Sequence, residues 1–174
     1  PRLVARIVEH CLEAGASRVY VVDHTIDTWH LAYKATGMER HPKQAGARLV
    51  QLRVFDMHRD AGIRLGLAVR EVCSAYRARL LLNGDPADMQ TIAADGLHLN
   101  SRALHACTTR PVGADRLVAA SCHDAADLAH AARLGADFSL LSPVLPTRSH
   151  PDAEPLGWKG FASLVEAAAL PVYA

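Results

Sequence analysis

The feature of this sequence that most constrains its fold is the alternation of amphipathic helical segments with short, apolar, β-branched runs. Seven such runs lie near residues 18, 48, 79, 96, 116, 137 and 171. Helical patterns separate several of them, over residues 61–78, 87–93, 125–134 and 161–169. Strands that are apolar throughout and alternate with helices predict parallel pairing, with the helices covering the outside. The sequence therefore predicts an α/β fold with a parallel sheet.

The number of strands favours a barrel over an open sheet. Seven candidate strands in 174 residues suit a TIM (β/α)8-type barrel better than a flavodoxin-like sheet of about five strands. The usual barrel has about eight strands and at least roughly 200 residues. We therefore predict a single barrel domain over residues 1–174 that is incomplete, with about seven strands.

Composition excludes several classes of protein and partner. The chain is 50% hydrophobic with a net charge of +1, which argues against a disordered chain. It contains no run of about 18 apolar residues, so no membrane partner is expected. The balance of 19 basic and 18 acidic residues produces no net positive electrostatic field to attract nucleic acid, so no nucleic-acid partner is expected. Its four cysteines are typical of reduced thiols in a cytoplasmic protein.

Polar residues follow the predicted strands, where parallel α/β folds carry their functional groups. These candidates are Gln51, Arg53, Asn83, His98, Ser121, His123, Thr147 and Ser149. An imidazole such as His123 suits proton transfer near neutral pH. Structural alternatives remain open, because Gln51 and His98 could be satisfied core residues and Asn83 could be a turn residue. A metal site formed by His98, His123 and His150 lacks the close ligand spacing of known sites.

Several segments in this order resemble the thiamine phosphate synthase/TenI family. They are LVQLR at 49–53, LLN at 81–83, ADGLHL at 94–99, SCH at 121–123, LGAD at 134–137 and SPVLPT at 142–147. The match is strongest over residues 48–174, and residues 1–47 are uncertain. The version with LLNGDP and SPVLPTRSHP most resembles the domain fused to Nudix hydrolases in some bacteria, although no Nudix box is present.

The resemblance implies a TIM barrel that binds a thiazole phosphate. In the family's synthases this ligand is joined to a pyrimidine pyrophosphate with Mg²⁺. By position in the motifs, Gln51 and Arg53 would hold pyrimidine or pyrophosphate, and Asn83 would contact the pyrimidine. Ser121 would lie near the pyrophosphate. Thr147 and Ser149 match the hydroxyls of the loop after strand six.

Departures from the family pattern argue against ligase activity. Gly84 and Ala103 stand where the synthases carry their metal-binding carboxylates, and His150 replaces a lysine. No metal or other cofactor is therefore expected. Mg²⁺ would be expected only if the chain were a true synthase. The tautomerase branch of the family aromatises a thiazole carboxylate phosphate without a metal. Its catalytic histidine lies in an element like 121–123, so His123 would be the acid/base, with His98 and Ser121 lining the pocket.

Several alternatives stay open beside this reading. The chain could be a synthase, a non-catalytic phosphate-binding module from a Nudix fusion, or a metal-dependent hydrolase, and a homo-oligomer is also left open. Residues 18–22 could be barrel strand one, or residues 1–22 could be a rearranged copy of the family's helix seven and strand eight. The family's Gly-Gly phosphate loop would begin directly after Ala174, so an incomplete barrel edge is expected there.

Overall fold

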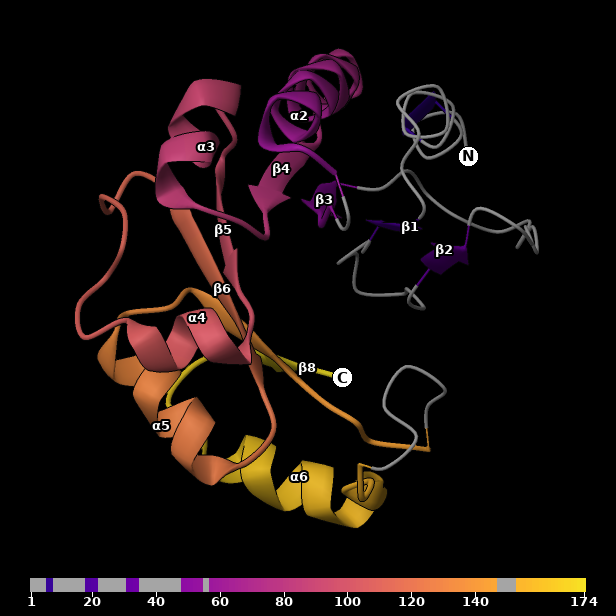
Figure 1. Ribbon diagram of the computed structural model, residues 1–174. Helices are drawn as coiled ribbons and strands as arrows, with labels where there is room; N and C mark the ends of the chain where they lie inside the picture. The colour runs from indigo at the N-terminus through magenta and orange to yellow at the C-terminus, as the bar shows by residue number, and fades with distance from the viewer. Residues whose placement is uncertain (1–5, 8–17, 22–30, 35–47, 55–56, 147–152) are drawn as a thin grey trace. The chain divides into compact units, whose positions relative to one another are not determined.

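The computed structural model describes residues 6–7, 18–21, 31–34, 48–54, 57–146 and 153–174 (Figure 1). It divides into two compact units, Pro1–Leu97 and His98–Ala174. The boundary falls inside strand β5 (Gly96–Leu99). Among the described residues no helix is long and apolar enough to cross a membrane.

Six strands form a sheet in the order β3-β4-β5-β6-β7-β8, and the registered pairs within it are parallel. Their bounds are Leu49–Leu52, Arg79–Leu82, Gly96–Leu99, Leu117–Cys122, Phe138–Leu141 and Val172–Tyr173. Each strand has its successor in the chain as a neighbour. This order is typical of a (β/α) barrel, whereas strand order reverses at a switch point in a doubly wound sheet. The predicted fold class, an incomplete TIM-type barrel, is confirmed.

The first unit packs two helices beside its strands, α2 (Arg59–Ala75) and α3 (Pro86–Ile92). Figure 1 shows them next to each other and to β4. In α2, Leu65 and Val69 are buried four residues apart, as expected for the core face of a helix. The Asp85 carboxylate begins α3 by accepting a hydrogen bond of 2.7 Å from a backbone N–H of its first turn.

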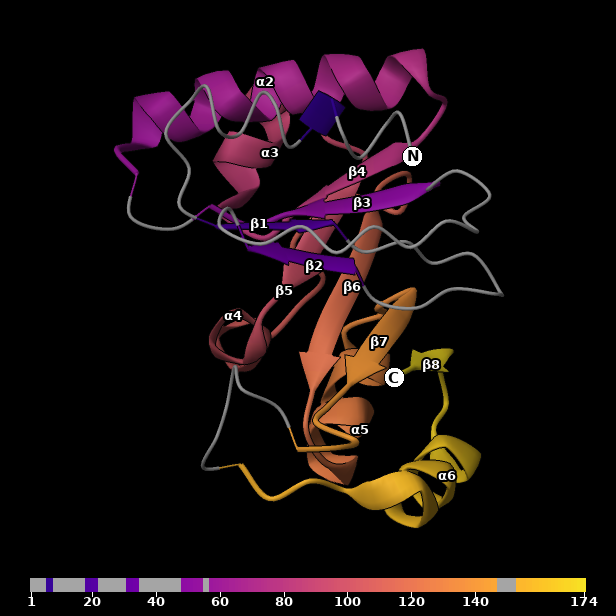
Figure 2. The ribbon, with the colours of Figure 1, turned by 90° about the vertical axis from the view of Figure 1, so that its right-hand side faces the viewer.

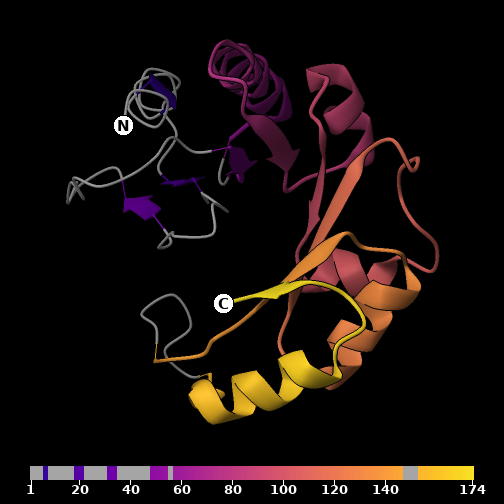
Figure 3. The same cartoon turned by 180° about the vertical axis from the view of Figure 1, so that it is seen from behind.

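The second unit contains α4 (Ser101–Ala106), α5 (Ala125–Arg133) and α6 (Gly157–Ala167). Figure 2 shows β6 and β7 as neighbouring strands, and Figure 3 shows α4 beside α5. The buried Leu128 and Ala131 form the core face of α5. The two helices beside β6 therefore fix the end of this strand, from which the loop to α5 begins.

An aspartate at the start of a strand braces the preceding strand in each unit. Asp95 Oδ2 accepts from the Leu80 N–H at 2.7 Å, and the Asp95 N–H donates to the Leu80 carbonyl at 2.8 Å. Asp137 makes the same two bonds with Val118, both at 2.7 Å. Because the side chain and the backbone of each aspartate both hydrogen-bond to one residue of the neighbouring strand, each aspartate fixes the register of the two strands.

An arginine supports the brace in each unit. Arg70 Nη2 lies 3.5 Å from Asp95 Oδ1, and Arg110 Nη2 lies 3.0 Å from Asp137 Oδ2. Each guanidinium also donates to the backbone carbonyl two residues before its aspartate. The same arrangement of charge and backbone is thus repeated in both units, as expected for successive βα repeats of one fold.

The strand expected near residue 18 exists but does not join the parallel sheet. β1 (Arg18–Val21) pairs antiparallel with β2 (Leu31–Lys34). The connection, residues 22–30, is shorter than the roughly dozen residues that a parallel crossover needs. Of residues 1–17 the structure describes only Arg6 and Ile7, which are helical.

Candidate functional site

In the first unit, three candidate residues lie at the carboxyl ends of β3 and β4. Gln51 lies on β3 and is buried, and Arg53 follows the strand with its side chain half-buried. The Asn83 N–H donates to the Leu52 carbonyl at 2.9 Å, which places Asn83 beside the end of β3. The structure therefore places these three residues at one edge of the sheet, and their role in binding stays a prediction.

In the second unit, a hydrogen bond joins two candidates on neighbouring strands. His98 on β5 is 3% exposed, and its Nε2 lies 2.8 Å from the Ser121 Oγ on β6. Ser121 is half-buried near the carboxyl end of its strand. A buried imidazole that holds a more accessible hydroxyl orients that hydroxyl for hydrogen bonding to a ligand.

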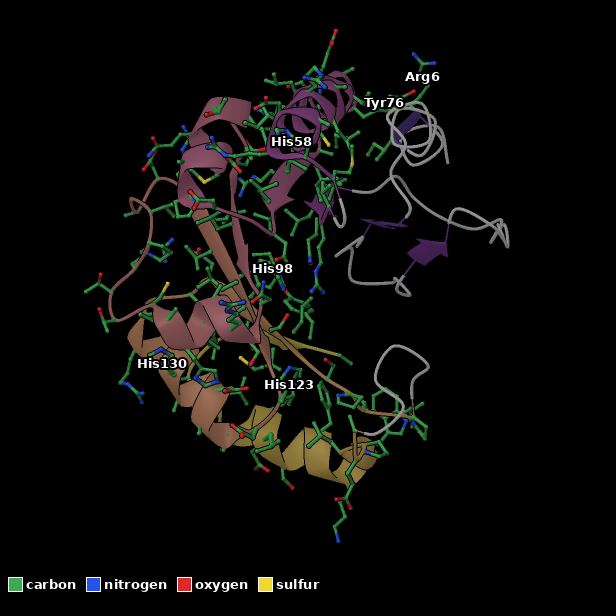
Figure 4. The ribbon with its side chains drawn as sticks, in the orientation of Figure 1. Arg6, His58, Tyr76, His98, His123 and His130 are labelled. Carbon is green, nitrogen blue, oxygen red and sulfur yellow. The ribbon has the colours of Figure 1, made fainter. Side chains whose placement is uncertain are left out.

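His123 lies just beyond β6 (Figure 4) and its side chain is exposed. Its Nδ1 lies 2.6 Å from the backbone carbonyl oxygen of Ser142, which follows β7. A carbonyl oxygen only accepts, so Nδ1 carries the hydrogen and the neutral ring has its lone pair on Nε2. Within the described part of the chain Nε2 has no hydrogen-bond partner. The arrangement therefore offers one oriented nitrogen for taking up or releasing a proton.

The backbone of His123 is held by the start of α5. The Asp124 side chain caps the helix by accepting from the Asp127 N–H at 2.8 Å. Asp127 Oδ2 in turn accepts from the His123 N–H at 2.9 Å. The sequence shows Asp127 only as a first-turn acidic residue with a favourable charge for the helix dipole, and it gives no signal for the Ser142 carbonyl. Both contacts of His123 are thus missed by reading residue types alone.

The thiol of Cys122, next to His123 in the chain, is buried and protonated. Cys122 is buried at the end of β6, and burial, followed by the charge of Asp127, raises the pKa of its thiol to about 12. Because the thiolate is the nucleophilic form, the Cys122 thiol is unreactive near neutral pH.

The positions at which the family's synthases hold Mg²⁺ do not fit the ion in this chain. Gly84 is exposed beyond β4 and has no side chain, and Ala103 lies within α4. The adjacent Asp85 carboxylate is engaged as the cap of α3. Across residues 57–146 and the other described segments, no three His, Cys, Asp or Glu side chains gather as a metal site would require.

Two of the predicted site residues cannot be placed. Thr147 and Ser149, together with His150, lie outside the described residues. The preceding part of the loop is described, and Leu156 and Gly157 donate from their backbones to Pro143 and Val144 at 2.9 Å each. The loop after β7 is therefore closed at its base.

Comparison with known proteins gives one consistent result. The family model described as thiamine monophosphate synthase matches residues 35–174. A putative thiamine-phosphate synthase 2 from Aquifex aeolicus is 35% identical over 129 residues, which is 74% of this chain and 69% of the relative. A putative thiamine-phosphate synthase from Geobacter sulfurreducens is 37% identical over 132 residues, 74% of this chain and 62% of the relative.

A solved structure supports the fold. The thiamine phosphate pyrophosphorylase from Pyrococcus furiosus superposes with a TM-score of 0.59 and 22% sequence identity, covering 73% of this chain and 61% of that protein. At this identity the similarity concerns the fold alone. The chain thus spans less than two thirds of the Geobacter and Pyrococcus proteins.

Proposed function

Since this chain belongs to the thiamine monophosphate synthase family, we propose that it binds a phosphorylated thiazole and acts as a tautomerase-like domain. In this reaction a proton leaves one atom of a thiazole carboxylate phosphate and a proton returns to another, and the ring becomes aromatic. His123 would carry these transfers. Ser121, held by His98, would hydrogen-bond the ligand, and Gln51, Arg53 and Asn83 are proposed ligand contacts of the first unit.

The observation that carries the proposal is the orientation of the His123 ring. The Ser142 carbonyl fixes the hydrogen on Nδ1, and Nε2 stays available on an exposed side chain. An oriented imidazole is a suitable general acid and base near neutral pH, and such a group typically contributes about 10²–10⁴-fold to a rate. The reaction requires no pyrophosphate leaving group, which is consistent with a glycine and an alanine at the two metal positions, 84 and 103.

Thiamine phosphate synthase activity is the second candidate. The names of the Aquifex and Geobacter relatives favour it. Gly84 and Ala103 argue against it, because a pyrophosphate leaving group needs cations against its developing charge. A non-catalytic phosphate-binding module, such as one once joined to a Nudix hydrolase, would keep the ligand contacts but need no free Nε2 on His123.

One assay separates these functions. The purified chain is incubated with thiazole carboxylate phosphate, and formation of the aromatic isomer is followed by chromatography. We expect His123→Ala to lower the rate by at least about 10²-fold, while the control His58→Ala, a similarly exposed histidine before α2, keeps it. Binding of thiazole phosphate without turnover would instead support the module. Formation of thiamine phosphate from both substrates with Mg²⁺ would refute the proposal in favour of the synthase.

A further inference from the structure

The Asp127 carboxylate connects the loop that carries His123 to the surface of helix α4. Asp127 is 4% exposed. Its Oδ2 accepts from the His123 N–H at 2.9 Å, and its Oδ1 lies 3.0 Å from Nε2 of His105. The His105 side chain is 60% exposed. A buried carboxylate with one oxygen on each side is thus a direct physical link between a surface imidazole and His123.

A helix cap alone does not account for this arrangement. In a capping box, the third helical residue reaches back to the N–H of the N-cap residue. Here the N-cap is Asp124, and Asp127 reaches one residue further back, to His123. A cap also has no need of the second oxygen, which faces His105 on another helix. The additional contacts therefore serve the loop rather than the helix end.

A second imidazole lies beside His105, and an arginine contacts it. The ring of His130 on α5 stacks on His105, with ring centroids 6.2 Å apart and planes at 10° (Figure 4 labels His130). Its Nε2 lies 3.1 Å and 3.0 Å from two backbone carbonyls at the end of α4, so it donates. Its Nδ1 lies 3.3 Å from Nη2 of Arg133, which can only donate. His130 thus donates through Nε2 and accepts through Nδ1, next to a permanently charged Arg133.

The groups facing Asp127 itself complete the inventory. Asp124, the N-cap of α5, accepts a hydrogen bond from the Asp127 backbone N–H. The exposed Asp124 carboxylate has the same sign of charge as the Asp127 carboxylate. Cys122 on β6 is a protonated thiol, since burial raises its pKa to about 12. Imidazoles change their charge between about pH 5 and 8, where no other unperturbed side chain does. His105 and His123 are exposed imidazoles of this cluster, and His105 is the one whose ring faces the Asp127 carboxylate.

We propose that Asp127 is a positioning residue for His123 and that the charge on His105 modulates this positioning. When His105 is protonated, its N–H⁺ draws the carboxylate charge toward Oδ1, because charge-assisted hydrogen bonds are the stronger ones. The bond from the His123 N–H to Oδ2 then weakens. When His105 is neutral, Oδ2 holds the His123 backbone more tightly. The catalytic consequence rests on the proposed tautomerase function, whereas the link between the two groups does not.

The test reads the backbone amide of His123 directly. Its proton chemical shift is followed by NMR from about pH 5 to 8, the range in which imidazoles titrate, in the wild type and in His105→Ala. We expect a component of the shift, moving downfield as pH rises, that is lost in His105→Ala. Arg102→Ala, which removes a positive charge from an exposed residue of the same helix, should retain it. Identical titration of the His123 amide in His105→Ala and the wild type would overturn the proposal.

Activity provides the second readout. Asp127→Asn keeps an oxygen that can accept from the His123 N–H, and we expect kcat to fall by roughly tenfold, up to about 10²-fold for a 1 Å displacement, with KM nearly unchanged. In Asp127→Ala, kcat should fall further, provided that circular dichroism shows this variant to be folded. An unchanged kcat and pH profile in Asp127→Asn would overturn the proposal. If the wild type has no tautomerase activity, the proposed function fails, yet the amide titration still decides the link.

Discussion

Helix α2 contains two glycines at which the same substitution by alanine should have opposite effects on stability. A Cβ added at Gly62 would have Val54 Cγ1, at 4.0 Å, as its nearest neighbour. A Cβ added at Gly66 would lie 2.8 Å from Ile92 Cγ1 and would contact Cδ1 of the same side chain. Because Gly66 is buried where α2 packs on α3, the absent side chain permits the close approach of the two helices.

The expected magnitudes follow from two competing terms. Replacing glycine by alanine within a helix stabilises by about 0.5–1 kcal/mol. Overpacking a well-packed core destabilises by about 1–3 kcal/mol. Gly62→Ala has only the first term and should raise the free energy of unfolding by up to about 1 kcal/mol. Gly66→Ala has both, with two Ile92 atoms under 3.0 Å, and should lower it by roughly 1–2 kcal/mol.

Urea unfolding followed by far-UV circular dichroism measures both changes. For a chain of this size, about 1 kcal/mol corresponds to a change in Tm of roughly 2–4 °C. Ile92→Val removes the Cδ1 atom, so it should cost less in the Gly66→Ala background than in the wild type, as a double-mutant cycle would show. If Gly66→Ala stabilises the chain as much as Gly62→Ala does, the close packing of α2 on Ile92 is refuted.

Two further predictions concern the Asp137 brace and the buried thiols. Asp137→Ala removes a charged acceptor from the Val118 N–H and should lower the free energy of unfolding by about 1.5–3 kcal/mol, measured by urea unfolding against Asp115→Ala, an exposed control. Burial raises the pKa of the Cys73 and Cys122 thiols from their ordinary value of 9.0 to about 12. Their neutral form therefore contributes stability that is complete below pH 9 and is lost as pH rises toward 12. A double Cys→Ala variant should show a flatter decline of stability over that range, and an equally steep decline would contradict this assignment.

Much of the fold could be predicted from the sequence, because buried parallel strands have a strong compositional signal. Every run expected as a strand is one in the structure. Helix α4 was not predicted, since Ser101–Ala106 is too short to show a period and depends on the Asn100 cap, which accepts from a backbone N–H at 3.0 Å. β2 was not predicted either: Trp29, Leu31 and Tyr33 alternate with other residues around it, but the polar, Gly and Pro residues of 23–47 interrupt the pattern.

The positions of the candidate residues could be predicted from the sequence, but their contacts could not. The rule that functional groups follow parallel strands selects His98 and Ser121, and the structure joins them. The contacts that orient His123 come from a backbone carbonyl and from a carboxylate one turn into α5. A carbonyl is present in every residue, so no residue type reveals which one a ring nitrogen meets. Such contacts become visible only once the ends of β6 and β7 are placed next to each other.

The strand order has a consequence for how the chain acquires its structure. Because each strand from β3 to β8 pairs with its immediate successor, every pairing closes a loop of only one βα repeat, and the entropy lost on closure stays small. Parallel sheets whose partners are distant in sequence fold slowly, since long loops must close before contacts compensate for them. Here the sheet can grow by one repeat at a time as the chain leaves the ribosome. The braces at Asp95 and Asp137 would then fix two of these pairings, β4–β5 and β6–β7, as β5 and β7 are added.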